Sequence, residues 1–148
     1  MTLNSLSRQI LATASLLIAL AICFWAFGAH GLKNILSANY LTIFHTGVEY
    51  QFYNTLGLFA LGLIANFSSN LKRLKIAFYF ILIGTIIFST SLYLLTILDM
   101  PILGAITPIG GTAQIIGWLI VFYSILKDWI WLLWNNFKNL ETLNGSLI

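Results

Sequence analysis

Charged side chains are scarce in this sequence of 148 residues. Asp, Glu, Lys and Arg together make up only 7% of it, whereas apolar residues make up 59%. A water-soluble globule of this size needs far more polar surface, so the chain must be solvated by lipid. Its formal charge of +3 is not gathered on a basic face with stacking aromatic residues, which argues against a nucleic-acid partner.

Cysteine is limited to Cys23, and the motifs of the common catalytic and cofactor sites are missing. One cysteine cannot form an internal disulfide or a multi-cysteine metal site. The sequence has no Gly-rich phosphate loop, no nucleophile elbow and no His-Glu-x-x-His zinc pattern. We therefore predict no cofactor, and an enzyme is not the favoured reading.

Long apolar segments are what the sequence does contain. They predict an all-α fold, with one integral membrane domain over residues 1–148 built as a four-helix transmembrane bundle. The predicted spans are 10–28, 46–67, 76–98 and 109–130, each close to the length of about 20 residues that a bilayer requires. Residues 131–148 are predicted to form an interfacial tail that frays from Asn135, because tryptophans precede this polar end.

The second span is the most informative, because its purely apolar part is too short to cross the hydrocarbon core. That part runs only from Thr55 to Ala65. The span must therefore include polar residues, and extending it toward the N-terminus brings Glu49 into the membrane. An ionisable residue inside a span is costly, so Glu49 is expected to have a partner.

The positions of the cations predict the orientation of the chain. Lys and Arg beside membrane helices are retained on the cytoplasmic side. With the four predicted spans, only Lys33 falls on the outer side, and the inner side receives Arg8, Lys72, Arg73, Lys75, Lys127 and Lys138. Both termini are therefore predicted to be inside.

Helical spacing predicts which faces of the spans pack together. The first span carries an inward-facing stripe of small and polar residues, namely Ala12, Ser15, Ala19, Cys23, Ala26 and His30. The second presents His45, Glu49 and Tyr53 at i, i+4 spacing, with Leu56 and Ala60 continuing the same inward face. On the fourth span Gly110, Gly111 and Gly117 are expected to permit close helix packing.

The predicted topology gathers the polar residues of the spans in the outer half of the bundle. The candidate polar cluster consists of His30, His45, Glu49, Tyr53, Ser89, Ser91, Tyr93, Thr107 and Gln114. Two readings are open at this point. The cluster lines an outward-facing cavity, or its members satisfy one another and fix the register of the helices.

Four short motifs in register resemble a known family. They are AFGAH at 26–30, TGVEYQ at 46–51, FSTSLY at 88–93 and TPIGG at 107–111, the last followed by Gly117 and Trp118. These motifs are similar to those of the YgdD-like family, small four-pass inner-membrane proteins of bacteria that are classified as a domain of unknown function. The resemblance covers about residues 10–126, and it implies a multi-pass protein of a bacterial inner membrane.

The sequence departs from the pattern of that family at three positions. Trp25 and Thr90 stand where the family usually has glycine, and Asn54 stands where histidine is common. The last difference weakens any histidine-based metal site. The tryptophan-rich segment after Asp128 is also longer than the basic tail of the family.

Three functions compete on this evidence. The first is a structural or accessory bundle that binds lipid, a membrane-protein partner or a second copy of itself; the aromatic inner edge at Trp129, Trp131 and Trp134 favours it. The second is binding or permeation of a small solute or ion through an outward-facing cavity around Glu49. The third is a metal site or membrane enzyme, with His30, His45 and Glu49 as ligands.

Overall fold

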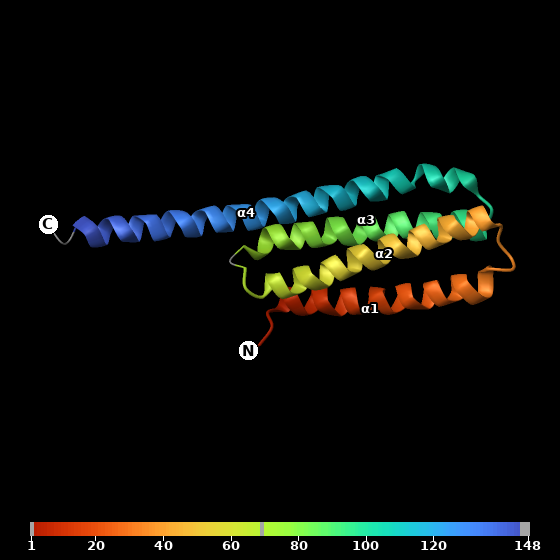
Figure 1. The fold of residues 1–148 in the computed structure, drawn as a ribbon, viewed down its shortest axis with the longest axis horizontal. Coiled ribbons are helices and arrows are strands. Elements are labelled where there is room, and N and C mark those ends of the chain that lie inside the picture. Colours follow the sequence, from red (N-terminus) through yellow and green to blue (C-terminus); the bar gives the residue numbers. More distant parts are fainter. Residues whose placement is uncertain (1, 69, 146–148) are drawn as a thin grey trace.

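Four long helices, joined by short connections, make up the computed structural model, which describes residues 2–68 and 70–145. They are α1 (Ser5–Phe27), α2 (Ala38–Ala65), α3 (Leu71–Ile97) and α4 (Thr107–Gly145). The helices run alternately up and down along a common axis (Figure 1). A π-helical turn, η1 (Gly28–Leu32), extends α1, and a 3-10 turn, η2 (Pro101–Ala105), precedes α4. The all-α prediction with four helices is confirmed.

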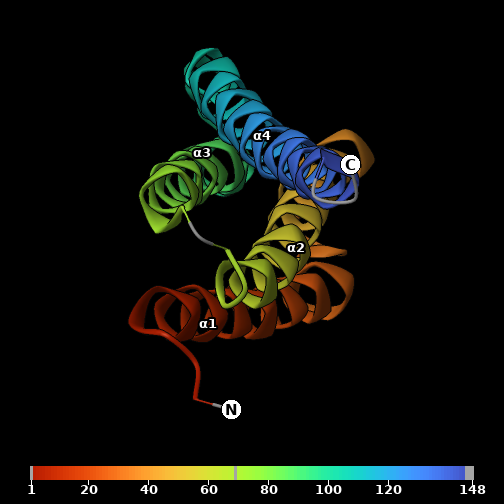
Figure 2. The same cartoon turned by 90° about the vertical axis from the view of Figure 1, so that its left-hand side faces the viewer.

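The helices pack in the order of the chain. α1 packs on α2, α2 on α3 and α3 on α4, whereas α1 and α3 hardly meet. The view along the bundle shows this open arrangement, with α2 and α3 between the two outer helices (Figure 2). Such neighbours are expected because each connection is short.

Within residues 2–68 and 70–145, three helical segments are long and apolar enough to cross a membrane, and they are Ser5–Leu32, Leu71–Ile97 and Pro101–Lys138. α2 has 28 residues and lies between α1 and α3, but it is less apolar than they are. Its lower hydropathy reflects the polar residues at 45–55, which the sequence already indicated. The predicted connection Leu32 to His45 is shorter in the structure, since α2 begins at Ala38.

Polar side chains define where three of the helices begin. The side-chain oxygens of Asn4, Ser37 and Asn70 accept hydrogen bonds from the backbone nitrogens of Ser7, Tyr40 and Arg73, at 2.8, 3.3 and 3.2 Å. These N-caps satisfy donors that the first helical turn leaves free, which matters more in lipid than in water.

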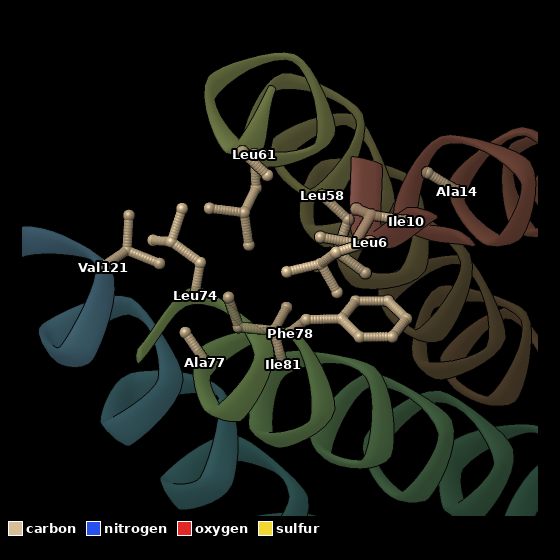
Figure 3. Close-up of a cluster of buried hydrophobic side chains, with 11 residues drawn as sticks. Leu6, Ile10, Ala14, Leu58, Leu61, Leu74, Ala77, Phe78, Ile81 and Val121 are labelled. Carbon is tan, nitrogen blue, oxygen red and sulfur yellow. The ribbon is translucent and has the colours of Figure 1, made fainter. Parts of the chain in front are cut away.

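The half of the bundle where α1 begins is held by apolar packing; it is called the inner half, and the opposite half the outer half, after the orientation that the sequence predicts. Its core contains Leu6, Ile10, Leu58, Leu74 and Phe78, together with Ala14, Leu61, Ala65, Ala77, Ile81 and Val121 (Figure 3). Residues from all four helices contribute, and Phe78 is fully buried among them. In lipid, such contacts stabilise by close van der Waals packing rather than by removal of apolar surface from water.

Helices α3 and α4 approach each other through glycine. A Cβ atom on Gly110 would lie 2.5 Å from the backbone nitrogen of Phe88, and one on Gly84 would lie 2.7 Å from the carbonyl oxygen of Gly110. Both positions therefore exclude a side chain, since the neighbouring atoms belong to the backbone. Gly117 also lies against α3, at Ile81, whereas a Cβ on Gly111 would make ordinary contacts with Phe88.

α4 is much longer than the other helices. The predicted fraying from Asn135 is wrong, because the helix continues to Gly145. α4 projects beyond the inner ends of α1, α2 and α3 (Figure 1). Helix-forming residues such as Leu132, Leu133 and Lys138 carry it past the predicted span, and the stretch has no internal glycine or proline to interrupt it.

Candidate functional site

A chain of hydrogen bonds links α3, α2 and α1 in the middle of the bundle. The Tyr93 hydroxyl donates to Gln51 Oε1 at 2.9 Å, and Gln51 Nε2 donates to the carbonyl oxygen of Leu17 at 2.9 Å. Both side chains are buried. Because unpaired polar groups are costly in an apolar medium, this chain fixes how the three helices align.

A second hydrogen-bonded group links α2 to α4. Trp118 Nε1 donates to Asn54 Oδ1 at 2.9 Å, while Asn54 Nδ2 donates to Gln114 Oε1 at 3.2 Å and to the carbonyl oxygen of Tyr50 at 2.9 Å. Gln114 Nε2 and the hydroxyl oxygen of Ser89 are buried without a partner among the described residues.

Glu49 and Tyr53 lie elsewhere, in a groove on the outer surface of the α1–α2 pair. The groove has a volume of about 440 Å³, and its other walls are Ala21, Ile22, Trp25, Ala26, Val48 and Phe52. Glu49 is half-buried there, and Tyr53 is 63% exposed. No hydrogen bond or ion pair joins the Glu49 carboxylate to another residue in the described part of the chain.

The two histidines do not join Glu49 in a common cluster. His45 packs against α1, with its ring centre 4.8 Å from that of Trp25, and its Nδ1 is buried without a partner among the described residues. His30 is exposed at the end of α1. No group of three His, Cys, Asp or Glu side chains that could hold a metal ion occurs in the described residues. The proposed ligands His30, His45 and Glu49 thus do not come together.

The predicted polar cluster divides into separate parts. Tyr93 and Ser89 line a cavity of about 360 Å³ beside Gln51, Gln114 belongs to the α2–α4 group, and Ser91 and Thr107 share a hydrogen bond of 2.8 Å between their hydroxyl oxygens. Glu49 and Tyr53 stay together in the surface groove.

The predicted inward faces of α1 and α2 are wrong. Tyr53, Leu56 and Ala60 are exposed, as is the stripe on α1 made up of Ala12, Ser15, Ala19, Cys23, Ala26 and His30. The buried face of α1 instead presents Ser7, Ile10, Ala14 and Ala21. Since lipid and protein interior are both apolar, small or polar residues alone do not tell which face is covered.

Sequence reasoning missed Gln51 and Asn54 as the centres of the buried polar groups. A signal was present, because Gly47, Gln51, Asn54, Leu58, Leu61 and Ala65 recur at intervals of three or four residues along α2. This period follows the buried face that the structure shows.

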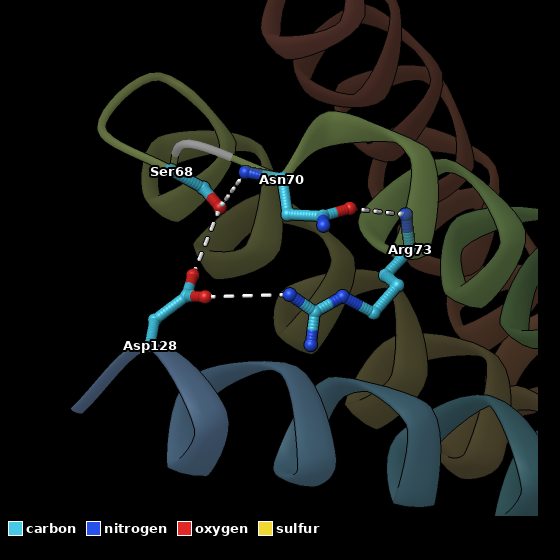
Figure 4. A network of polar contacts seen from close by, with 4 residues as sticks. All are labelled: Ser68, Asn70, Arg73 and Asp128. Carbon is cyan, nitrogen blue, oxygen red and sulfur yellow. Dashed lines mark hydrogen bonds and ion pairs between the residues drawn. The ribbon is translucent and has the colours of Figure 1, made fainter. Parts of the chain in front are cut away.

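A further polar group closes the inner end of the bundle. Arg73 Nη2 lies 3.4 Å from Asp128 Oδ1, and the Ser68 hydroxyl lies 3.5 Å from Asp128 Oδ2 (Figure 4). The backbone nitrogen of Asn70 donates to the Ser68 hydroxyl oxygen at 3.2 Å. This group ties the α2–α3 connection to α4.

The chain matches a family profile described as "Protein of unknown function (DUF423)" over residues 24–111. This chain belongs to that family. The matched region contains the α2 residues that line the groove and the α2 and α3 residues that form the central hydrogen bonds. It ends before Gln114, Lys127 and Asp128 on α4.

Curated relatives support the same assignment. The chain is 42% identical to the UPF0382 membrane protein YwdK of Bacillus subtilis over 108 residues, which are 73% of this chain and 88% of the relative. It is 39% identical to a UPF0382 membrane protein of Haemophilus influenzae over 107 residues, which are 72% of this chain and 85% of the relative. No solved structure matches.

The family assignment confirms the resemblance that the four motifs carry. With its long apolar helices and these relatives, the chain is a bacterial membrane protein with several helical spans. It therefore sits in a lipid bilayer.

Proposed function

We propose that all four helices cross a bacterial inner membrane, with both termini in the cytoplasm, and that the protein is an accessory bundle that binds lipid-like molecules from within the bilayer. α2 supports four crossings because its 28 residues extend about 42 Å and its backbone is hydrogen-bonded throughout. The cations at the end of the bundle where α1 begins support the orientation.

The Glu49 carboxylate in its apolar groove carries this proposal. Glu49 lies about 16 Å into α2, so if α2 is centred across a hydrocarbon core of about 30 Å the carboxylate is about 10 Å below the outer edge of that core. A carboxylate at that depth requires a partner, and the described residues supply none. An occupant of the groove would supply it.

The shape and chemistry of the groove favour one class of occupant. Its volume of about 440 Å³ falls within the range of small-molecule sites, about 300–1,000 Å³. Apart from Glu49 its walls are mainly aliphatic and aromatic, so the occupant has a hydrocarbon body. Its head must offer a cation or a hydrogen-bond donor to Glu49. A long-chain amine fits this description.

A photoreactive probe tests the proposal. We would incorporate the full chain into lipid nanodiscs with a diazirine-bearing C16 primary amine, illuminate it and locate adducts by mass spectrometry. We expect adducts on residues 21–26 and 48–53, and a loss of labelling of about fivefold in Glu49→Gln. Uniform labelling over all lipid-facing helices, or unchanged labelling in Glu49→Gln, would refute the proposal.

Two alanines on α1 provide a matched pair of blocking variants. Ala26 lines the groove, whereas Ala19 is exposed on the same helix but does not line it. Ala26→Leu should fill part of the groove and suppress labelling. Ala19→Leu should leave labelling as in the wild type, and equal suppression by both variants would count against a defined site.

A further inference from the structure

A second ligand site is suggested by a basic cavity at the inner end of the bundle. It measures about 470 Å³ and lies between the α2–α3 connection and α4, where Arg73, Lys127 and Asp128 line it beside Asn70 and Trp131. With two cationic side chains and one carboxylate, the cavity carries a net positive charge. An anion is therefore the ligand that this cavity favours.

Arg73 is held in place, but not all of its hydrogen-bond donors have an acceptor. Asp128 contacts its Nη2 at 3.4 Å, and the ring of Tyr123 lies 5.8 Å below the guanidinium carbon. Its Nη1 is buried and has no hydrogen-bond acceptor among the described residues. A guanidinium fixed on one side with donors free on the other is suited to binding phosphate oxygens.

An apolar cavity adjoins the basic one. It measures about 330 Å³, and four lining residues, Phe67, Ser68, Asp128 and Leu132, belong to both cavities. Its remaining walls include Ile64, Leu74 and Ile125, which are apolar. A charged compartment that opens into an apolar one matches the head and the chain of a phospholipid.

Ser124 supplies an independent observation inside the apolar cavity. It lines that cavity, is 1% exposed, and has a hydroxyl oxygen without a partner among the described residues. Ser124 lies one helical turn deeper than Asp128, a step of about 6 Å along α4. An ester carbonyl lies at about such a depth below a lipid phosphate, where the Ser124 hydroxyl could donate to it.

We propose that the inner end of the bundle binds an anionic phospholipid, with the phosphate against Arg73 and Lys127, an ester carbonyl on Ser124, and an acyl chain beside Ile64 and Ile125. This site is separate from the groove around Glu49. The lipid would fasten α4 to the α2–α3 connection, in addition to the Arg73–Asp128 ion pair.

Lipid titration of the full chain in mild detergent, followed by native mass spectrometry, tests this site. Phosphatidylglycerol should bind severalfold more tightly than phosphatidylcholine, whose choline cation would face Arg73 and Lys127. Removing one lysine contact from an anionic lipid should lower affinity about fivefold, so we expect that loss in Lys127→Gln. Lys138→Gln is the matched control on the same helix, and it should change affinity less than twofold.

Two further arms identify the ligand. Inorganic phosphate at millimolar concentration should not displace the lipid, whereas displacement would show that the cavity binds free phosphate and would overturn the lipid assignment. Wild type should prefer ester-linked over ether-linked phosphatidylglycerol, and Ser124→Ala should abolish that preference. Equal losses in Lys127→Gln and Lys138→Gln, or an ester preference that persists in Ser124→Ala, would contradict the proposed contacts.

Glu49→Gln separates this proposal from the proposed function. It removes the carboxylate of the groove but touches nothing at the inner end, so phosphatidylglycerol affinity should remain at the wild-type value. A parallel loss of phosphatidylglycerol binding in Glu49→Gln would instead show that the titration does not report the inner cavity.

Discussion

The inner and outer halves of the bundle are held together by different means. The inner half packs aliphatic side chains and Phe78 from four helices into a continuous core. The middle and outer half places Gln51, Asn54, Tyr93 and Gln114 between the helices and joins them by hydrogen bonds. The amides that join one helix to the next lie in the second half, whereas the inner half has the buried Ser7 hydroxyl, which donates to the carbonyl oxygen of Gly62, and the Arg73–Asp128 ion pair at its end.

This difference shows how helices in a bilayer obtain a defined register. Apolar side chains lose little when they exchange a protein neighbour for a lipid chain, so the inner core tolerates small displacements. A buried amide that shifts by one residue loses its partner in a medium that offers no substitute. The hydrogen bonds of the outer half should therefore set the register of the helices, and the apolar side chains of the inner half pack within that register.

The largest effect is expected from breaking the glycine contact of the outer half. In Gly110→Ala the new methyl group would collide with the backbone of α3, which should lower the free energy of unfolding by about 2–3 kcal/mol. Gly111→Ala is the control, because its Cβ would have ordinary contacts and alanine favours helix by up to about 1 kcal/mol. Unfolding in mixed micelles with increasing SDS, followed by circular dichroism, measures both. Equal stability of the two variants would show that α3 and α4 are not in close contact.

A smaller effect should follow from removing the amide that links three helices. Gln51→Leu leaves the Tyr93 hydroxyl without an acceptor and should lower the free energy of unfolding by about 1 kcal/mol. Adding Tyr93→Phe should restore part of this loss, which the same SDS titration would show as a coupling in a double-mutant cycle.

The inner half offers a control for that substitution. Gln9 Nε2 lies 3.3 Å from the Tyr79 hydroxyl on an exposed surface, so Gln9→Leu should leave stability nearly unchanged. If Gln9→Leu and Gln51→Leu lowered the free energy of unfolding by the same amount, the proposed difference between the two halves would be wrong.

The smallest effect concerns a contact between the first turn of α2 and the connection that follows α3. The Tyr40 hydroxyl donates to Asp99 Oδ1 at 2.6 Å, and this hydrogen bond raises the pKa of Tyr40 above its usual value of 10.0. Because the raised pKa favours the neutral phenol in the folded state, the contact stabilises fully below pH 10 and is lost as pH rises through the raised pKa.

An absorbance titration of tyrosinate tests this pH dependence. The difference between wild type and Tyr40→Phe should show one phenol that ionises above pH 10. A titration at or below the usual pKa would contradict the contact with Asp99. The core contacts of both halves should be unaffected by this variant.

The sequence was sufficient to predict which segments form helices, but not how each helix is rotated about its own axis. Long apolar runs predicted α1, α3 and most of α4, since length and hydropathy alone determine which segments can enter a bilayer. The face of α2 was predicted wrongly because polar residues occur on both of its sides, with Gln51 and Asn54 buried and Glu49 and Tyr53 at the surface. Spacing alone did not distinguish an amide that pairs in the core from a carboxylate beside a groove.

The same physical reason explains the limits at the candidate sites. Glu49 stood out because a carboxylate inside a span is rare, but its surroundings depend on how α1 rotates against α2. The inner cavity could not be predicted from the sequence, because Arg73 and Lys127 come to line the same cavity only through the packing of α3 against α4. The distribution of these cations along the sequence indicates the orientation of the chain, but it does not show that the two side chains line one cavity.

The length of α4 has a consequence for the membrane in which the protein resides. Its 39 residues extend about 58 Å, against about 30 Å of hydrocarbon. Lys127 and Asp128 interrupt the apolar surface of α4 before Trp129, Trp131 and Trp134, which are exposed. Tryptophans at such a position anchor a helix at the level of the lipid headgroups. This end of α4 should therefore fix the depth and the tilt at which the whole bundle sits in the bilayer.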